Sequence, residues 1–379
     1  MNNQQTYHSL CRWTFNAGKG GFVPGGMRPS MNASTLSTEQ VVSLIRDKIA
    51  PRLPEHIVLG YEVHYDTEVD ADNAAALADQ LVDANMALAM ITPGLHSHFG
   101  YGGPASLDAS ERSKANDLSQ KTVDLTYSVL RKAWHSDAAL APSLVLWNGS
   151  YGYDLATPLV QDMYNHLKKS VADLCAYEAS KGGELYFGIE PKPNEGHPAM
   201  LLPTVASAIL FWLRLQSEYG VSLDKKGINK EFGHSEMIGL DAVYDTVEEI
   251  DNKMVTHMHL NSQGYGDGIT LGGSGRYDID HGFKINGTGV AIASLVSTAQ
   301  YSRWYGHDMQ MRPYDSEEQG IDRVIRSILS WDACQFAARG LDLSALQSAM
   351  LERKTALAED VMRNAVVTAQ QYFNELYNG

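Results

Sequence analysis

Short apolar runs alternating with longer amphipathic segments restrict the fold of this chain more than any other feature. The apolar runs predict strands at residues 7–14, 57–65, 86–91, 143–147, 185–190, 227–231, 257–260 and 304–310. Apolar residues at helical spacing predict helices between them, at 38–49, 71–84, 110–133, 159–181, 202–218, 237–253 and 291–302. Eight strands that alternate with helices predict an α/β fold of the (β/α)8, or TIM-barrel, type.

After the eighth predicted strand the chain continues for about seventy residues, which is more than such a barrel needs. Ile325, Ile328 and Leu329 recur at turn spacing there, so we expect helices up to about residue 378. We predict a TIM-barrel catalytic domain at 1–320 and a C-terminal helical extension at 321–379. This arm would pack on the outside of the barrel or on a neighbouring subunit. At the first helix, Gln40 follows Ser37 at the spacing of a capping box.

The overall composition is that of an ordinary soluble protein, with 44% hydrophobic and 20% charged residues. A formal net charge of -15 argues against nucleic acid and anionic membranes as partners, because both need a basic surface. Three widely separated cysteines make neither a disulfide framework nor a zinc-thiolate motif, which favours a reducing compartment. The first residues lack a signal-peptide pattern, and no apolar run reaches membrane-spanning length. We therefore expect a cytoplasmic protein.

Acidic, basic and imidazole groups follow the predicted strands. An apolar run ends at Glu190, with Lys192 two residues later on the same side of an extended chain. On its own this segment also allows a simpler interpretation, an exposed Glu–Lys ion pair in a proline-rich loop. Similar groups follow the other strands: His64 and Asp66; Glu231 and His234; His257, His259 and Asn261; Asp278 and Asp280; His307 and Asp308.

In a TIM barrel the carboxyl ends of all the strands meet at one mouth. A single histidine at a strand end more often packs than binds a ligand, and a paired aspartate more often lies in a solvated turn. Acids and imidazoles gathered from these strand ends would repel one another and lose hydration unless cations compensated them. Carboxylates with one or two imidazoles and no thiolate suit Mg²⁺, Mn²⁺ or Co²⁺, and two ions sharing a bridging carboxylate are one arrangement of this kind.

These motifs resemble those of the xylose isomerase family. Residues 190–195 (Glu-Pro-Lys-Pro-Asn-Glu) are similar to its strand-5 signature, and residues 231–240 to its strand-6 motif. Residues 260–263 resemble its strand 7, and residues 277–280 its paired-aspartate loop. The likeness includes Trp13, Phe22, Arg28, His64 and Trp147, and it spans the chain from Trp13 to Asp308.

The resemblance implies two divalent cations per subunit (Mn²⁺, Mg²⁺ or Co²⁺). It gives the first cation the ligands Glu190, Glu231, His259 and Asp308, and the second the ligands Glu231, His234, Asp278 and Asp280. It also implies catalytic roles for three residues. His64, supported by Asp66, would open the sugar ring, and Lys192 would polarise the carbonyl at C1 during a 1,2-hydride shift.

The substrate-binding residues implied by the resemblance are Trp13, Trp147 and Phe22, the last from a neighbouring subunit of a homotetramer or homodimer. One ligand position departs from the pattern, because xylose isomerases have Asp where this chain has His259. A histidine there is similar to rhamnose isomerases and ketose 3-epimerases, and it lowers the negative charge of the first site by one unit. The roles of His96, His98 and His257 stay open.

The leading hypothesis is a metal-dependent aldose–ketose sugar isomerase, and the alternative is a ketose epimerase or another reaction on a sugar derivative or glycoside. The shorter Asp308 at strand 8, where an epimerase would place a glutamate base, favours isomerisation. A metal-dependent DNA-repair nuclease on the same barrel disagrees with the net charge. A catalytically inactive binding protein would have lost ligands, whereas here the one altered position carries another good ligand.

Overall fold

A closed barrel of eight parallel strands forms the centre of the molecule in the computed structural model, which describes residues 5–15, 36–147, 157–193, 200–262, 280–311 and 315–378. Neighbouring strands follow the order β1-β10-β7-β6-β5-β4-β3-β2. The predicted TIM-barrel fold is confirmed. The strands are β1 (Thr6–Cys11), β2 (Ile57–His64), β3 (Ala87–Thr92), β4 (Ser143–Leu146), β5 (Tyr186–Ile189), β6 (Lys226–Glu231), β7 (Val255–His259) and β10 (Tyr305–His307). Two short strands, β8 (Asn261–Ser262) and β9 (His281–Gly282), pair antiparallel beside the barrel.

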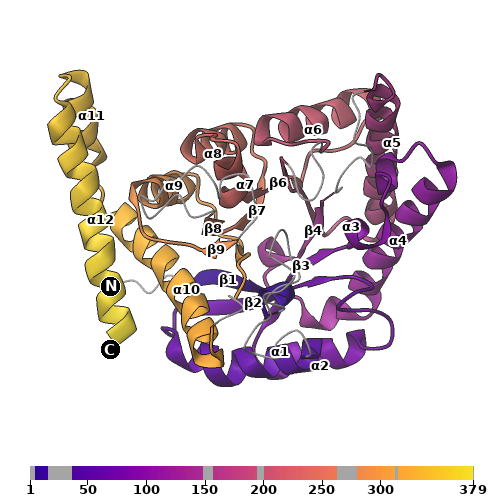
Figure 1. The fold of residues 1–379 in the computed structure, drawn as a ribbon, viewed down its shortest axis with the longest axis horizontal. Helices are drawn as coiled ribbons and strands as arrows, with labels where there is room; N and C mark the ends of the chain where they lie inside the picture. Colours follow the sequence, from indigo (N-terminus) through magenta and orange to yellow (C-terminus); the bar gives the residue numbers. More distant parts are fainter. Residues whose placement is uncertain are drawn as a thin grey trace.

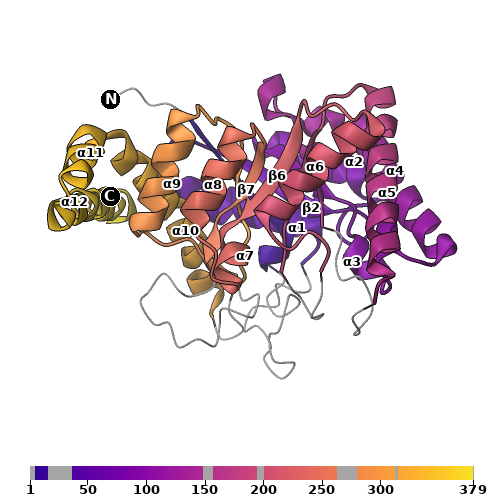
Figure 2. The ribbon, with the colours of Figure 1, turned by 90° about the horizontal axis from the view of Figure 1, so that it is seen from above.

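Helices surround the barrel on the outside, as Figures 1 and 2 show. The α-helices of the described residues are α1 (Thr38–Leu44), α2 (Ala74–Asp83), α3 (Leu95–His98), α4 (Ala109–Ser128), α5 (Val160–Lys181), α6 (Val205–Tyr219), α7 (Phe232–Met237), α8 (Ala242–Asp251), α9 (Gly287–Thr298), α10 (Glu317–Arg339), α11 (Leu343–Leu351) and α12 (Thr355–Asn378). The hydrophobic core lies between the strands and these helices, where Trp212 and Trp331 are fully buried. None of the helices in the described ranges is long and apolar enough to cross a membrane.

Local sequence signals account for how several helices begin and end. The predicted capping box forms at α1, where the Ser37 hydroxyl accepts from the Gln40 backbone and the Gln40 side chain accepts from the Ser37 backbone. The single helix predicted at 237–253 is wrong. Gly239 adopts a positive φ of 71° and ends the α7 segment, and Asp241 then caps α8 by accepting from Val243 N and Tyr244 N.

The sixth strand begins at a charged residue, one position before the predicted start at 227. Lys226 is the first residue of β6 and is buried. Its Nζ lies 4.3 Å from the ring centroid of Phe187 and 4.0 Å from the Glu178 carboxylate. The aliphatic part of such a side chain packs like an apolar residue while its charge finds a partner, so a lysine can begin a buried strand.

The C-terminal helices divide into two parts. α10 packs against α9 and belongs to the ring around the barrel, whereas α11 and α12 form an antiparallel pair at its edge (Figure 1). The predicted boundary at residue 320/321 falls within α10, and α12 packs along the outside of α10. The division into two domains and the use of the arm in oligomer contacts stay predictions.

Candidate metal centre

Four strands of the barrel bring acids and one imidazole to the same level at their carboxyl ends. Glu190 directly follows β5, Glu231 ends β6, His259 ends β7 and Asp308 directly follows β10. Glu231 pairs in register with His259, and His259 with Gly306, which places the neighbouring side chains side by side. All four are buried, so the exposed ion pair that the Glu190 segment alone also allowed is not what forms.

The Nδ1 atom of His259 is the centre of this group. It lies 3.4 Å from Glu190 Oε2, 3.6 Å from Glu231 Oε2 and 3.4 Å from Asp308 Oδ2. Two ligands of one small divalent cation, each roughly 2.1 Å from it, lie about 3 Å apart. Ligand atoms from Glu231, His259 and Asp308 are all within 4.8 Å of one another. The spacing and the oxygen-rich donor set therefore fit a divalent cation.

The ionisable groups in this centre shift one another's pKa values. Burial raises the pKa of Glu190, and the neighbouring Glu231 raises it further. Burial, then Glu231, raise the pKa of Asp308 well above its usual range. Burial alone would lower the pKa of His259, but Glu62, Glu231 and Asp308 raise it well above its ordinary value. Without a cation these carboxylates therefore hold protons more tightly, which is the behaviour of ligands assembled for a positive charge.

A second group of possible ligands shares Glu231. His234 Nε2 lies 3.0 Å from Glu231 Oε1, and Glu190, Glu231 and His234 form another cluster with ligand atoms within 4.8 Å. Asn261 Nδ2 donates to Glu231 Oε1 at 2.7 Å and to Asp280 Oδ1 at 3.3 Å, which holds the buried Asp280 close to the shared carboxylate. Asp278 lies outside the described residues.

The carboxylate beside His64 differs from the one predicted. Glu68 Oε2 accepts from the His64 backbone N–H at 2.8 Å and lies 3.0 Å from His64 Nδ1. Asp66 has a positive φ of 68° and lies 3.5 Å from His98 instead. The turn after β2 reverses the chain at Asp66, so the residue four positions after His64 comes back to it. The predicted support of His64 by Asp66 is therefore corrected to Glu68.

Aromatic rings form one wall of the site. Trp13 lies with its ring centroid 4.2 Å from that of His64, and its Nε1 donates to Asp308 Oδ1 at 2.7 Å. His96, on α3, lies 4.1 Å from Trp147 and 5.2 Å from His64 between ring centroids. The buried Lys192 places its Nζ 4.5 Å from the centroid of the Trp147 ring. Trp13, Trp147, His64 and Lys192 thus meet at one side of the mouth, while Phe22 and Arg28 lie outside the described residues.

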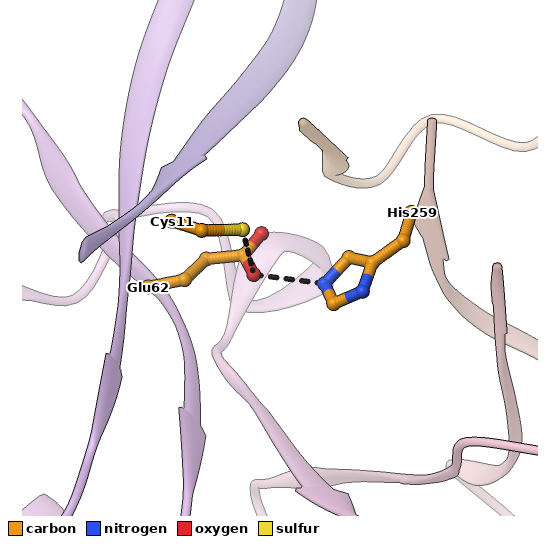
Figure 3. Close-up of side chains that lie close together, drawn as sticks. All are labelled: Cys11, Glu62 and His259. Atoms are coloured by element: carbon orange, nitrogen blue, oxygen red, sulfur yellow. Dashed lines mark hydrogen bonds and ion pairs between the residues drawn. The ribbon is translucent and has the colours of Figure 1, made fainter. Parts of the chain in front are cut away.

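Two residues in the layer beneath the centre were assigned no role from the sequence. Glu62, on β2, is fully buried and lies 2.9 Å from both His257 Nε2 and His259 Nε2 (Figure 3 shows the His259 contact). His257, whose role was open, therefore belongs to the support of the site. The alternation of side chains along a strand could have identified Glu62, because it lies two residues before His64 and so faces the same side of β2.

Comparisons with known proteins agree with this architecture. No family model matches the chain. A xylose isomerase from Thermus caldophilus is 26% identical over 235 residues, which cover 58% of this chain and 57% of that protein's length. Among solved structures, a putative xylose isomerase from Rhodospirillum rubrum aligns with a TM-score of 0.58 and 14% identity, over 87% of this chain and 99% of that one. An L-ribulose 3-epimerase aligns with a TM-score of 0.56 and 13% identity, over 89% and 96% of the two chains.

Fold and site together define a (β/α)8 barrel with a buried group of carboxylates and imidazoles at the carboxyl ends of its strands. Within that class, the chain is similar in sequence to a xylose isomerase and shares its fold with a putative xylose isomerase. The resemblance seen in the strand-end motifs is confirmed at this level.

Proposed function

We propose that this protein is a divalent-metal-dependent aldose–ketose sugar isomerase. The observation that carries the proposal is the buried Lys192, which lies beside Trp147 at the rim of the acid–imidazole centre. A buried ammonium group at that place can donate to the carbonyl oxygen of a sugar and stabilise negative charge that develops there. The likeness to a xylose isomerase supports this function.

Different residues of the site would bind the cations and transfer protons. A divalent cation held by Glu190, Glu231, His259 and Asp308, with a second held by Glu231, His234, Asp280 and Asp278, would polarise the sugar oxygens. His64, oriented by Glu68, would move a proton between the anomeric hydroxyl and the ring oxygen and so open the ring.

The rest of the mouth would then favour transfer of hydrogen over exchange with water. Lys192 would donate to the oxygen at C1 of the open-chain aldose while hydrogen passes from C2 to C1 as a hydride. The proton lost from the hydroxyl at C2 would end on the oxygen at C1, which leaves a carbonyl at C2 and a hydroxyl at C1. Trp13 and Trp147 would cover the reacting carbons with apolar surface and exclude water.

A ketose epimerase on the same barrel is the second candidate. His259 favours it, because a histidine at this ligand position is the feature that departs from the xylose isomerase pattern. The L-ribulose 3-epimerase shows that the fold is shared with such an enzyme. Epimerisation would remove and return a proton at one carbon, whereas isomerisation would keep the substrate hydrogen within the molecule.

A screen of aldoses and ketoses with Mn²⁺, Co²⁺ and Mg²⁺ in deuterium oxide separates these reactions. We expect conversion of an aldose to its ketose, with little deuterium at C1 of the product by mass spectrometry. A product that differs at one carbon and carries deuterium there would establish the epimerase instead. Turnover that persists after complete metal removal would overturn both candidates.

The Lys192→Met variant tests the residue that carries the proposal. We expect kcat for aldose–ketose interconversion to fall roughly 10²–10³-fold, the usual effect of losing one group that stabilises developing charge. Metal content should be unchanged by elemental analysis. Lys121→Met, which removes an exposed lysine on α4, is the matched control and should keep full activity. Wild-type turnover in Lys192→Met would rule out the assigned role.

A further inference from the structure

A buried carboxylate supports the candidate metal centre from below. Each carboxylate oxygen of Glu62 lies within hydrogen-bonding distance of two groups. Ser9 Oγ donates to Oε1 at 2.5 Å and Cys11 Sγ to Oε2 at 3.4 Å, while His257 Nε2 and His259 Nε2 lie 2.9 Å from Oε1 and Oε2. These contacts come from β1, beside β2, and from β7, on the far side of β1 and β10 in strand order.

Room for this carboxylate is built into β10. A Cβ atom at Gly306 would lie 2.3 Å from Glu62 Oε1 and 2.7 Å from His259 Cδ2. Any larger residue would displace the two side chains, so the absence of a side chain at 306 leaves the space that they fill. Gly306 on β10 thus leaves room for the contact between Glu62 and His259.

The Glu62 contact determines which nitrogen of His259 faces the ligands. Because Glu62 accepts the Nε2 proton, Nδ1 is directed toward Glu190, Glu231 and Asp308 at 3.4–3.6 Å. A metal-binding histidine commonly donates its other ring N–H to a carboxylate, which fixes the tautomer and makes the ligand nitrogen more basic. Figure 3 shows Glu62 and His259 in this orientation.

We propose that Glu62 is a positioning residue for the first cation site. Glu62 orients His259, and its negative charge, placed behind the imidazole, substitutes for the charge that an aspartate at position 259 would carry. The pair Glu62–His259 then replaces one directly bound carboxylate by a neutral ligand with a carboxylate behind it. The inference deepens the proposed metal-dependent function and rests on it.

The neighbouring thiol serves Glu62 as a donor. Cys11, Glu62 and His259 place possible ligand atoms within 4.8 Å of one another, which also describes a small metal site. Both Glu62 oxygens already have two partners each, however, and burial, then the Glu62 charge, raise the pKa of Cys11 well above its usual range. A protonated thiol is a weak hydrogen-bond donor and a poor ligand.

Calorimetric titration of metal-free protein with Mn²⁺, in the absence of sugar, tests the inference. In Glu62→Gln we expect the Kd of one cation to weaken about 10–100-fold, the usual effect of losing such a partner, while the other stays near its wild-type value. Circular dichroism of the metal-free variant verifies folding. Cys11→Ser retains a donor to Glu62 and should bind both cations as the wild type does. An unchanged first Kd in Glu62→Gln would overturn the inference.

The double variant Glu62→Gln/His259→Asp separates orientation from a general loss of structure. His259→Asp alone brings a second carboxylate toward Glu62 and should weaken the first Kd. The double variant returns the total charge to that of the wild type and should recover the first Kd to within about threefold, because the two changes are coupled. Additive losses of affinity in the double variant would contradict the inference. If Glu62→Gln alone does not fold, the Kd of the first cation in the double variant is the deciding measurement.

Titration with Co²⁺ distinguishes the remaining outcomes. A thiolate-to-cobalt charge-transfer band that Cys11→Ser removes would show that Cys11, Glu62 and His259 hold the metal themselves, which overturns the positioning role. If the wild type binds no divalent cation, both this inference and the proposed function fail. Cation binding that depends on Glu62, without sugar turnover, would overturn the proposed function alone.

Discussion

His64 shows how much a single turn can change a residue-level assignment. Two carboxylates follow it closely, and only the backbone conformation at Asp66 decides that Glu68 comes back to the imidazole. A residue with φ near +68° reverses the chain in a way that sequence spacing does not reveal. Glu68 is therefore the residue expected to orient His64.

Exchanging each carboxylate for its amide tests this assignment. We expect Glu68→Gln to lower kcat for the sugar reaction about 10–100-fold, because the amide no longer fixes the Nδ1 proton of His64, and to change the pH profile of kcat. Asp66→Asn, its matched control, should change kcat by less than about threefold, since an exposed contact contributes little. Equal losses in the two variants would contradict the role of Glu68.

At the scale of elements, β6 and α8 enclose a buried lysine and a buried glutamic acid. Lys230 Nζ donates to Thr246 Oγ1 at 2.6 Å and also contacts the Ala242 carbonyl oxygen. Neither carboxylate oxygen of the fully buried Glu249 has a hydrogen-bond partner within the described part of the chain. Burial raises the pKa of Glu249 to about 8, even though Lys230 acts to lower it.

This raised pKa predicts how stability depends on pH. The folded state keeps the Glu249 proton up to about pH 8, whereas the unfolded chain releases it near its ordinary pKa of 4.5. Between these values the folded state binds more protons, so the contribution of Glu249 to stability is present at low pH and decreases as the pH rises to about 8. Its size is on the order of a few kcal/mol, since one pKa unit corresponds to about 1.4 kcal/mol.

Glu249→Gln should therefore flatten the dependence of the melting temperature on pH. We expect the variant to melt several degrees above the wild type at pH 8.5 and close to it at pH 5.5, in thermal scans with metal removed. Glu359→Gln changes an exposed glutamate on α12 and is the control. Parallel melting curves for the wild type and Glu249→Gln across this pH range would count against the assignment.

At the scale of the whole molecule, closure of the barrel brings the carboxylates of the candidate metal centre close together despite their mutual repulsion. The coupled carboxylates of the centre come from β5, β6 and β10, so their repulsion acts against closure of the sheet. A bound cation would offset that repulsion. The exposed Met350 and Leu351 on α11 show where the arm still has apolar surface, and the predicted homotetramer or homodimer stays a prediction.

Metal extraction should lower the thermal stability of the entire barrel. We expect the melting temperature to fall on the order of 5–10 °C after treatment with EDTA and to recover on addition of Mn²⁺. A ligand at about a thousand times its Kd contributes roughly 4 kcal/mol. Domains of about 150–250 residues shift roughly 2–4 °C per kcal/mol, and a larger barrel shifts less. Manganese-saturated EDTA is the control for the chelator itself. Identical melting before and after extraction would argue against a cation that bridges the strands.

The sequence by itself determined the barrel, the eight strand positions and the set of strand-end acids and imidazoles. Hydrophobic periodicity and the rule that carboxyl ends of parallel strands meet at one face are enough for that. The break between α7 and α8 could also be read locally, from Gly239 followed by a capping Asp241.

Only the tertiary structure decided the partners of those residues. Glu68 rather than Asp66 reaches His64 because of a turn, and Glu62 reaches His259 because closing the sheet brings β2 within reach of β7 across a glycine in β10. Hydrogen-bond partners depend on distances between residues far apart in the chain, nearly 200 positions for Glu62 and His259, and these distances are set when the barrel closes. The contacts of the layer beneath the candidate centre were therefore visible only in the folded molecule.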